Sequence, residues 1–184
     1  MTGSYTIQDF GPSDLLTSAR EGTRRLRVDV GQTGFFERRE FRISQELNIA
    51  SGGSLTFKFS SPVNFILLEQ TIACDANLLK FEAVVGGTPS GTFNTPVAIW
   101  GKNRMTFQPE YTGQVTISTG GSVTGGQIAE VIRLKASNAT AQQTTASGGI
   151  GTERGLPAGD YYLRLSAPTG DVTGTLSLVW EERP

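Results

Sequence analysis

Hydrophobic residues recur at every second position along most of the chain. Leu55, Phe57 and Phe59, for example, alternate with polar neighbours. The same alternation occurs at residues 26–30, 79–85, 115–117, 128–134, 161–165 and 176–180. Because successive side chains of a β-strand point to opposite faces, this period predicts strands with one buried and one solvated face.

Glycine-rich turns separate these segments at short intervals. Such pairs occur at positions 52–53, 86–87, 120–121 and 125–126. Glycine adopts the left-handed backbone conformations that many tight turns need. Roughly eight to ten strands at this spacing predict an all-β fold, either a jelly-roll-like domain or another antiparallel β-sandwich.

Three segments depart from the alternating pattern. Residues 63–68 are a mostly apolar run, which predicts a strand at the centre of a sheet with both faces covered. Residues 13–21 are the best helix candidate, although the segment is short. Residues 136–155 contain few apolar side chains and predict a long polar loop, of the kind that is usually functional or disordered.

The beginning of the chain differs from the rest. We expect residues 1–22 to form an N-terminal arm and residues 23–184 to form the β-sandwich domain. Tyr5, Ile7 and Phe10 are apolar residues of this arm. An extension that orders on binding covers a large surface per residue, so we expect the arm to order against a neighbouring subunit.

Composition narrows the chemistry that the chain can carry. Its 184 residues include no histidine, which removes the most frequent general base and metal ligand. Cys74 is the only cysteine, so an intrachain disulfide and a multi-cysteine zinc site are excluded. We therefore expect a protein that is not an enzyme and has no catalytic residues, no metal and no cofactor.

The charge balance bears on the choice of partner. The chain has 16 Lys and Arg residues against 17 Asp and Glu residues, a formal net charge of −1. It therefore lacks the broad positive field that gathers nucleic acid or an anionic membrane. The chain also shows neither a signal-peptide pattern nor an apolar run long enough to cross a bilayer. We expect no nucleic-acid partner and no membrane.

Basic residues are densest near the predicted start of the sandwich. Arg24, Arg25 and Arg27 fall in one predicted strand, where Arg25 and Arg27 share a face and Arg24 flanks it. Planar guanidinium groups suit carboxylate or phosphate partners. The group is either a docking patch for an acidic partner surface or a solvated face paired with nearby acidic side chains.

Two other sets of residues suggest chemistry. A glycosidase would need two carboxylates at a set separation, although turn caps and solvated strand faces explain the candidates better. These candidates are Glu69, Asp75, Glu82 and Asp160. Aromatic rings can line a sugar-binding surface, with core packing as the alternative. These rings are Trp100, Trp180, Tyr5, Tyr111, Tyr161 and Tyr162.

Three segments resemble small structural proteins from the virions of tailed bacteriophages. They are TRRLRVDVGQTGFFERREFRISQELNIASG, GGTPSGTFNTPVAIWGKNRM and ERGLPAGDYYLRLSAPTGDVTGTLSLVWEE. The resemblance spans most of residues 23–182. It implies a β-sandwich or jelly-roll protein of the head or tail, with a structural role and no catalytic residues.

From this resemblance we expect a non-enzymatic capsid decoration or cement protein that stabilises the assembled head. Its partners would be the major capsid protein or other virion subunits, and it would be made and assembled in the host cytoplasm. Repeated weak contacts become strong through multivalency. We expect a homo-oligomer, with a trimer favoured by analogy with the family. The alternatives are a tail, baseplate or fibre-attachment protein and a carbohydrate-binding receptor module.

The residues that we expect to contact a partner come from the arm and from the basic strand. They are Tyr5, Ile7, Phe10, Arg24, Arg25 and Arg27.

Overall fold

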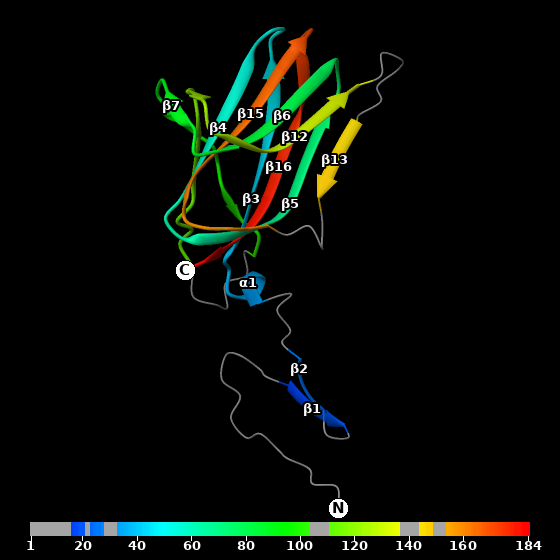
Figure 1. Cartoon of the computed structure of the whole chain (residues 1–184), viewed down its shortest axis with the longest axis vertical. Coiled ribbons are helices and arrows are strands. Elements are labelled where there is room, and N and C mark those ends of the chain that lie inside the picture. The colour runs from blue at the N-terminus through cyan, green and yellow to red at the C-terminus, as the bar shows by residue number, and fades with distance from the viewer. Residues whose placement is uncertain (1–15, 21–22, 28–32, 104–110, 137–143, 149–153) are drawn as a thin grey trace, which may run out of the picture. The chain divides into compact units, whose positions relative to one another are not determined.

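The computed structural model describes residues 16–20, 23–27, 33–103, 111–136, 144–148 and 154–184. Figure 1 shows its elements. In chain order they are β1 (Leu16–Arg20), β2 (Thr23–Arg27), α1 (Thr33–Phe36), β3 (Glu40–Ile49), β4 (Ser54–Ser61), β5 (Asn64–Cys74), β6 (Leu78–Val85), β7 (Thr88–Ser90), β8 (Thr95–Pro96), β9 (Trp100–Gly101), β10 (Thr116–Thr119), β11 (Ser122–Thr124), β12 (Gln127–Lys135), β13 (Thr144–Gly148), β14 (Arg154–Leu156), β15 (Gly159–Thr169) and β16 (Val172–Arg183).

The chain divides into two compact units, residues 1–33 and residues 34–184. In the first unit β1 pairs antiparallel with β2, with Leu16 opposite Arg27. The boundary that we expected after residue 22 falls inside this unit, between its two strands. The second unit is the β-sandwich.

The helix predicted at residues 13–21 is wrong, because Leu16–Arg20 form β1. A helix this short is marginal in water unless tertiary contacts support it. As a strand, the same residues pair their backbone groups with those of β2. Among the described residues the one helix is α1, which has four residues and precedes β3.

Two antiparallel sheets form the sandwich. Sheet 1 has the strand order β12-β6-β15-β4-β10-β8. Sheet 2 has the order β13-β5-β16-β3-β9, and β14 also pairs with β5. The predicted all-β sandwich is therefore confirmed.

Eight strands of the two sheets follow jelly-roll connectivity. In chain order they are β3, β4, β5, β6, β12, β13, β15 and β16. Sheet 2 joins the first, eighth, third and sixth of these, and sheet 1 joins the second, seventh, fourth and fifth. This interleaving is the double Greek key of a jelly roll.

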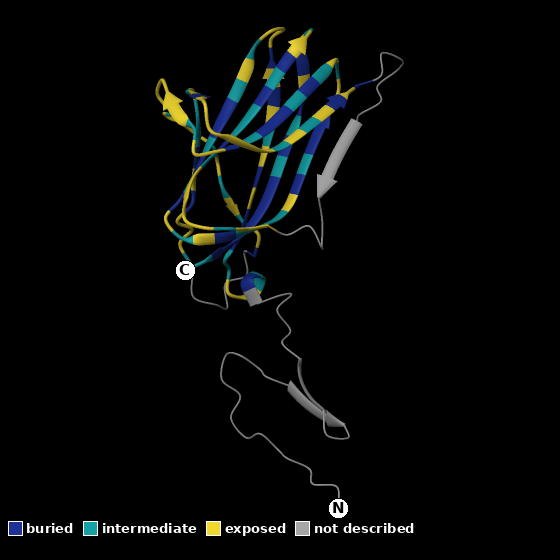
Figure 2. Cartoon of the chain, viewed as in Figure 1, coloured by how far each residue is buried: buried dark blue, intermediate teal, exposed yellow. Residues whose placement is uncertain are grey.

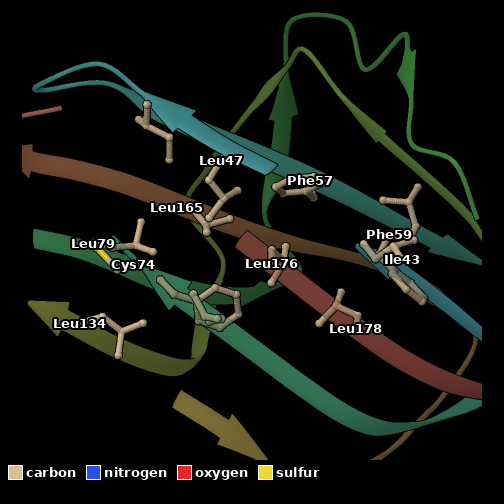
Figure 3. Packing of buried hydrophobic residues seen from close by; sticks show 14 of the residues in the cluster. Ile43, Leu47, Phe57, Phe59, Cys74, Leu79, Leu134, Leu165, Leu176 and Leu178 are labelled. Atoms are coloured by element: carbon tan, nitrogen blue, oxygen red, sulfur yellow. The ribbon is translucent and has the colours of Figure 1, made fainter. Parts of the chain in front are cut away.

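The core lies between the two sheets, where the alternating hydrophobic residues meet. On β3, Ile43 and Leu47 are buried whereas Ser44 and Glu46 are exposed, and Figure 2 shows this alternation along the strands. Figure 3 shows Leu176 and Leu178 of β16 near the centre of the cluster. The period of two in the sequence therefore identified the buried face of most strands correctly.

The apolar run at residues 63–68 does not form a strand buried on both faces. It enters β5, but within it only Phe65 is buried, while Ile66 and Leu68 are half-buried. Over this stretch β5 pairs on one side with the three-residue β14. The most thoroughly buried strand is β16, which lies between β5 and β3.

The predicted polar loop at residues 136–155 is wrong in part, because it contains β13 and the start of β14. Both strands pair with β5. The β13 sequence TTASG has little apolar character, yet its β-branched threonines suit a strand at the edge of a sheet.

A long insertion, residues 86–126, joins β6 to β12. Its strands β8 and β10 extend sheet 1, and β9 extends sheet 2. Its strands β7 and β11 pair with each other, and Val123 packs on Val84 and Tyr162 of sheet 1. Gly126 permits the close approach of its own backbone to Gly87, since its φ is +80° and an added Cβ would lie 2.7 Å from the backbone nitrogen of Gly87.

Candidate functional site

Three buried glutamates lie where β3 begins and β16 ends. Glu40, Glu181 and Glu182 are 5%, 4% and 0% exposed, respectively. We call them the carboxylate cluster. Burying a carboxylate costs free energy unless hydrogen bonds or opposite charges compensate it, so the partners of each glutamate indicate what the cluster does.

Glu182 binds the segment that precedes β10. Its Oε2 accepts hydrogen bonds from the Tyr111 hydroxyl at 3.0 Å and from the Gln114 backbone N–H at 2.9 Å. Its Oε1 accepts a third from the Val115 backbone N–H at 3.1 Å. Burial is the largest cause of the raised pKa of Tyr111, and the hydrogen bond to Glu182 raises it further. The hydroxyl therefore remains protonated and is a donor at neutral pH.

Glu181 and Glu40 are opposite one another on β16 and β3. Arg183 lies 2.8 Å from Oε2 of Glu181, and Arg39 lies 3.7 Å from Oε1. Lys102 lies 2.8 Å from Oε2 of Glu40. Burial raises the pKa of Glu181, and the attraction of the two arginines opposes this rise only in part.

The cluster also contacts α1. An added Cβ at Gly34 would lie 2.1 Å from Cδ of Glu181, so the absence of a side chain permits this close approach. The Asn103 side-chain amide donates a hydrogen bond to the Phe35 carbonyl at 2.9 Å. These contacts tie α1, β9 and the segment before β10 to the end of sheet 2. We interpret the carboxylate cluster as a structural joint.

None of the three glutamates of this joint is among the functional residues predicted from the sequence. Alternation along β16 nevertheless places Glu182 on the same face as Leu178 and Trp180, which are buried. A carboxylate on the inward face of a strongly apolar strand requires internal partners. This pattern could have identified Glu182 from the sequence.

Glu82 lies on the outer face of sheet 1 and is 3% exposed. Arg164 Nε donates to its Oε2 at 2.9 Å, and Lys80 Nζ lies 2.7 Å from its Oε1. Burial alone would raise the pKa of Glu82. The hydrogen bonds from Lys80 and Arg164 outweigh that effect and hold the pKa below the ordinary value of 4.5.

The predicted glycosidase carboxylates do not converge on one site. Arg164 is directly opposite Glu82, and Asp160 lies four residues before Arg164 on β15. Four residues of a strand span about 13 Å, which exceeds the separation of roughly 9.5 Å at the upper end for such pairs. Asp160 is bound to Lys58 and Ser60, while Glu69 and Asp75 are exposed.

An ionic contact beside β12 joins the two sheets. The two terminal nitrogens of Arg154, Nη1 and Nη2, donate to Glu130 at 2.6 and 2.8 Å. The Gln70 side chain adds a hydrogen bond to the same carboxylate at 3.3 Å. The hydrogen bond from Arg154 is the main reason why the pKa of Glu130 lies below its ordinary value of 4.5.

This lowered pKa predicts a loss of stability in acid. Folding favours the ionised Glu130, so its contribution is present above the ordinary pKa and is lost as the pH falls through the lowered one. At pH 7, Glu130→Gln should lower the free energy of unfolding by about 1 kcal/mol, a modest value because the Arg154 side chain is 47% exposed. Urea unfolding between pH 7 and pH 3 measures the difference from wild type.

We expect that difference to shrink below pH 4.5. Glu46→Gln is the matched control, since Glu46 is an exposed residue of β3. A difference between wild type and Glu130→Gln that is the same at pH 3 and pH 7 would contradict the assignment.

The predicted partner contacts fall in the first unit. Arg24, Arg25 and Arg27 lie on β2, where Arg25 is opposite Ser18 of β1. The predicted strand is therefore present, but it belongs to a hairpin outside the sandwich. The predicted contacts of the arm lie outside the described residues. They are Tyr5, Ile7 and Phe10.

The predicted aromatic sugar surface is not formed as a set. Trp180 is 0% exposed and stacks on Phe41 at a ring-centroid distance of 6.0 Å. Tyr162 is also buried, beneath the insertion. Trp100, by contrast, is 54% exposed. Core packing therefore explains Trp180 and Tyr162.

An irregularity in β12 changes which side chains reach the surface. The register with β6 shifts between Ile128 and Glu130, so that Ile128 is opposite Val84 and Glu130 is opposite Ala83. A β-bulge of this kind reverses the faces on its two sides. Ile128 therefore lies on the outer face, 47% exposed, although alternation predicted it on the same face as Ile132.

The outer face of sheet 1 along β12 combines apolar and basic residues. Val131 is 48% exposed and is opposite Glu82, while Arg133 is opposite Lys80. We call this surface the β12 face. It consists of Lys80, Glu82, Ile128, Val131, Arg133, Lys135 and Arg164.

Within the described ranges, no group of three or more acidic or cysteine side chains is arranged to hold a metal ion. In the same part of the chain, no helix has the length and apolar character needed to span a membrane. No protein-family model and no curated protein matches the sequence. The interpretation of function therefore depends on the fold and on the contacts described above.

Proposed function

We propose that this chain is a non-enzymatic structural protein of a bacteriophage virion, acting as a capsid decoration or cement protein. The observation that carries the proposal is the jelly-roll connectivity of residues 34–184. Jelly rolls recur in viral capsid proteins, and this is the fold that the sequence resemblance implies. Because one fold serves many functions, the contacts of the carboxylates described above must also be consistent with this proposal.

The buried and half-buried carboxylates are compatible with a scaffold. Glu182 accepts three hydrogen bonds, and Glu82 contacts two cations. Glu130 forms an ion pair with the guanidinium group of Arg154. Apart from the contact between Lys80 and Glu82 within β6, these contacts join different strands or segments of the sandwich. Such networks fix the positions of strands and insertion, which suits a protein that presents a fixed surface to its neighbours.

The N-terminal unit supports an attachment role. A two-stranded hairpin has little stability by itself in water, so β1 and β2 would gain stability by covering a partner. The proposed partners are the major capsid protein or other virion subunits. A homo-oligomer, with a trimer favoured by the resemblance, would multiply each weak contact.

The proposal predicts that purified virions of the phage that encodes this chain contain it. Mass spectrometry should detect the protein, and immunogold labelling should place it on the head at repeated positions. Unrelated phage particles labelled with the same antibody are the control. Labelling confined to the tail would favour a tail, baseplate or fibre-attachment protein, and absence from the particles would refute a virion role.

A further inference from the structure

We propose that the β12 face is a docking surface for an acidic protein surface. The inference rests on the proposed function, because it identifies which side of the jelly roll meets the capsid or another virion subunit. It concerns the sandwich alone and does not involve β1 or β2.

Cross-strand pairing places the side chains of this surface in adjacent rows. Val131, Glu82 and Arg164 are neighbours across β12, β6 and β15. Arg133 and Lys80 form the next row. Side chains directly opposite one another share a face, so apolar and basic groups lie side by side on the outside of sheet 1.

The apolar part of the surface remains exposed although the insertion covers its neighbours. Val84 and Tyr162, in the row next to Val131, are 1% and 2% exposed because Val123 and Phe93 pack on them. Ile128 and Val131 are 47% and 48% exposed. Adjacent exposed aliphatic residues with a polar surround are typical of the centre of a protein interface.

The charge of the surface indicates the partner. Two cations, Lys80 and Arg164, meet one carboxylate, Glu82, and Arg133 lies in the row beside them. Glu82 holds Lys80 and Arg164 in place, at 2.7 and 2.9 Å. Side chains that are already fixed lose less entropy on binding. The local excess of positive charge complements carboxylates of a partner.

Two other occupants fit less well. Two copies meeting through this face would bring their basic residues together, which disfavours self-association. Nucleic-acid binding relies on many phosphate contacts and on stacking, whereas the exposed apolar residues here are the aliphatic Ile128 and Val131. The combination of aliphatic and basic residues on the β12 face therefore favours a protein partner.

Thiol labelling tests the surface directly. Cys74 is the only cysteine and is 0% exposed, so a cysteine introduced at the surface would provide the accessible thiol. Val131→Cys places it on the β12 face. Ser44→Cys is the matched control, because Ser44 is exposed on β3 in the other sheet. Maleimide labelling rates are compared for the free protein and for the protein attached to heads.

We expect Val131→Cys to be labelled about tenfold more slowly on heads than in solution, because an interface centre excludes solvent. The Ser44→Cys rate should change little. If wild-type protein attaches but Val131→Cys is labelled equally fast in both states, the inference is overturned and the proposed function survives. If wild-type protein is absent from the particles, the proposed function fails and the inference fails with it.

Charge reversal provides a second readout. The double variant Arg133→Glu, Lys135→Glu should attach to heads about tenfold more weakly, and added salt should weaken wild-type attachment in the same direction. Arg42→Glu, an exposed change on the outer face of sheet 2, should attach normally. Normal attachment by the folded double variant would overturn the inference.

Two further outcomes would reassign the surface. Concentration-dependent protection of Val131→Cys in the free protein would indicate a second copy as the occupant. Binding of a 30-base-pair DNA duplex at about 0.15 M salt, abolished by the double variant, would indicate nucleic acid. Either result would overturn an acidic protein as the partner.

Discussion

Replacing Glu182 with alanine is expected to lower the free energy of unfolding by about 4 kcal/mol, because it leaves the N–H groups of Gln114 and Val115 without their acceptor. The Tyr111 hydroxyl loses a partner as well. A buried donor without an acceptor costs about 1–3 kcal/mol. The Val115 N–H is buried and takes this cost in full, and the part-buried Gln114 N–H and Tyr111 hydroxyl add to it.

Urea unfolding, followed by tryptophan fluorescence, measures this loss. Glu46→Ala is the matched control, since it removes an exposed glutamate from β3 and should change stability by no more than about 0.5 kcal/mol. In Glu182→Ala, hydrogen exchange should accelerate at the amides of Gln114 and Val115 before it does so in β16. Equal stability of the Glu182 and Glu46 variants would refute the joint.

The alternating pattern predicted most strands correctly because it is a local property. On β4, Phe57 and Phe59 are buried in the core and Leu55 packs against it, as their spacing indicates. Local pattern also places the turn glycines, for example Gly52, whose φ is +75°. Neither feature depends on which strands become neighbours.

Features that depend on distant pairing were not predicted. The register shift after Ile128 exposes this residue, and it is defined only relative to β6. β13 lacks an apolar pattern and exists as a strand because β5 offers an unpaired edge. The β12 face depends on both Lys80 and Arg133, which are more than fifty positions apart in the sequence.

The candidate site was harder to predict than the fold. The residues that we selected were conspicuous in the sequence, such as the arginines Arg24 and Arg25, and they lie outside the sandwich. Glu182 and Val131 are ordinary residues of strands. Glu182 is distinguished by being a buried carboxylate, and Val131 by being an exposed aliphatic residue.

The buried tryptophan provides the second large effect. Trp180→Ala should lower the free energy of unfolding by about 3–5 kcal/mol, because it leaves a large cavity in the core. Its ring is 0% exposed, stacks on Phe41 and meets Phe59 edge-on at 5.2 Å. At about 2–4 °C per kcal/mol for a domain of this size, the thermal midpoint should fall by roughly 6–20 °C.

Trp100→Ala is the matched control, because its ring is 54% exposed. This variant should change the thermal midpoint little. Differential scanning calorimetry measures the thermal midpoints of both variants and of wild type. A glycan array compares their binding to carbohydrates. If Trp180→Ala kept the stability of wild type and lost glycan binding, Trp180 would have to act at a surface, contrary to its burial between the sheets. We expect both variants to keep the glycan binding of wild type and only Trp180→Ala to have a lower thermal midpoint. This result would assign Trp180 to the core and Trp100 to the surface.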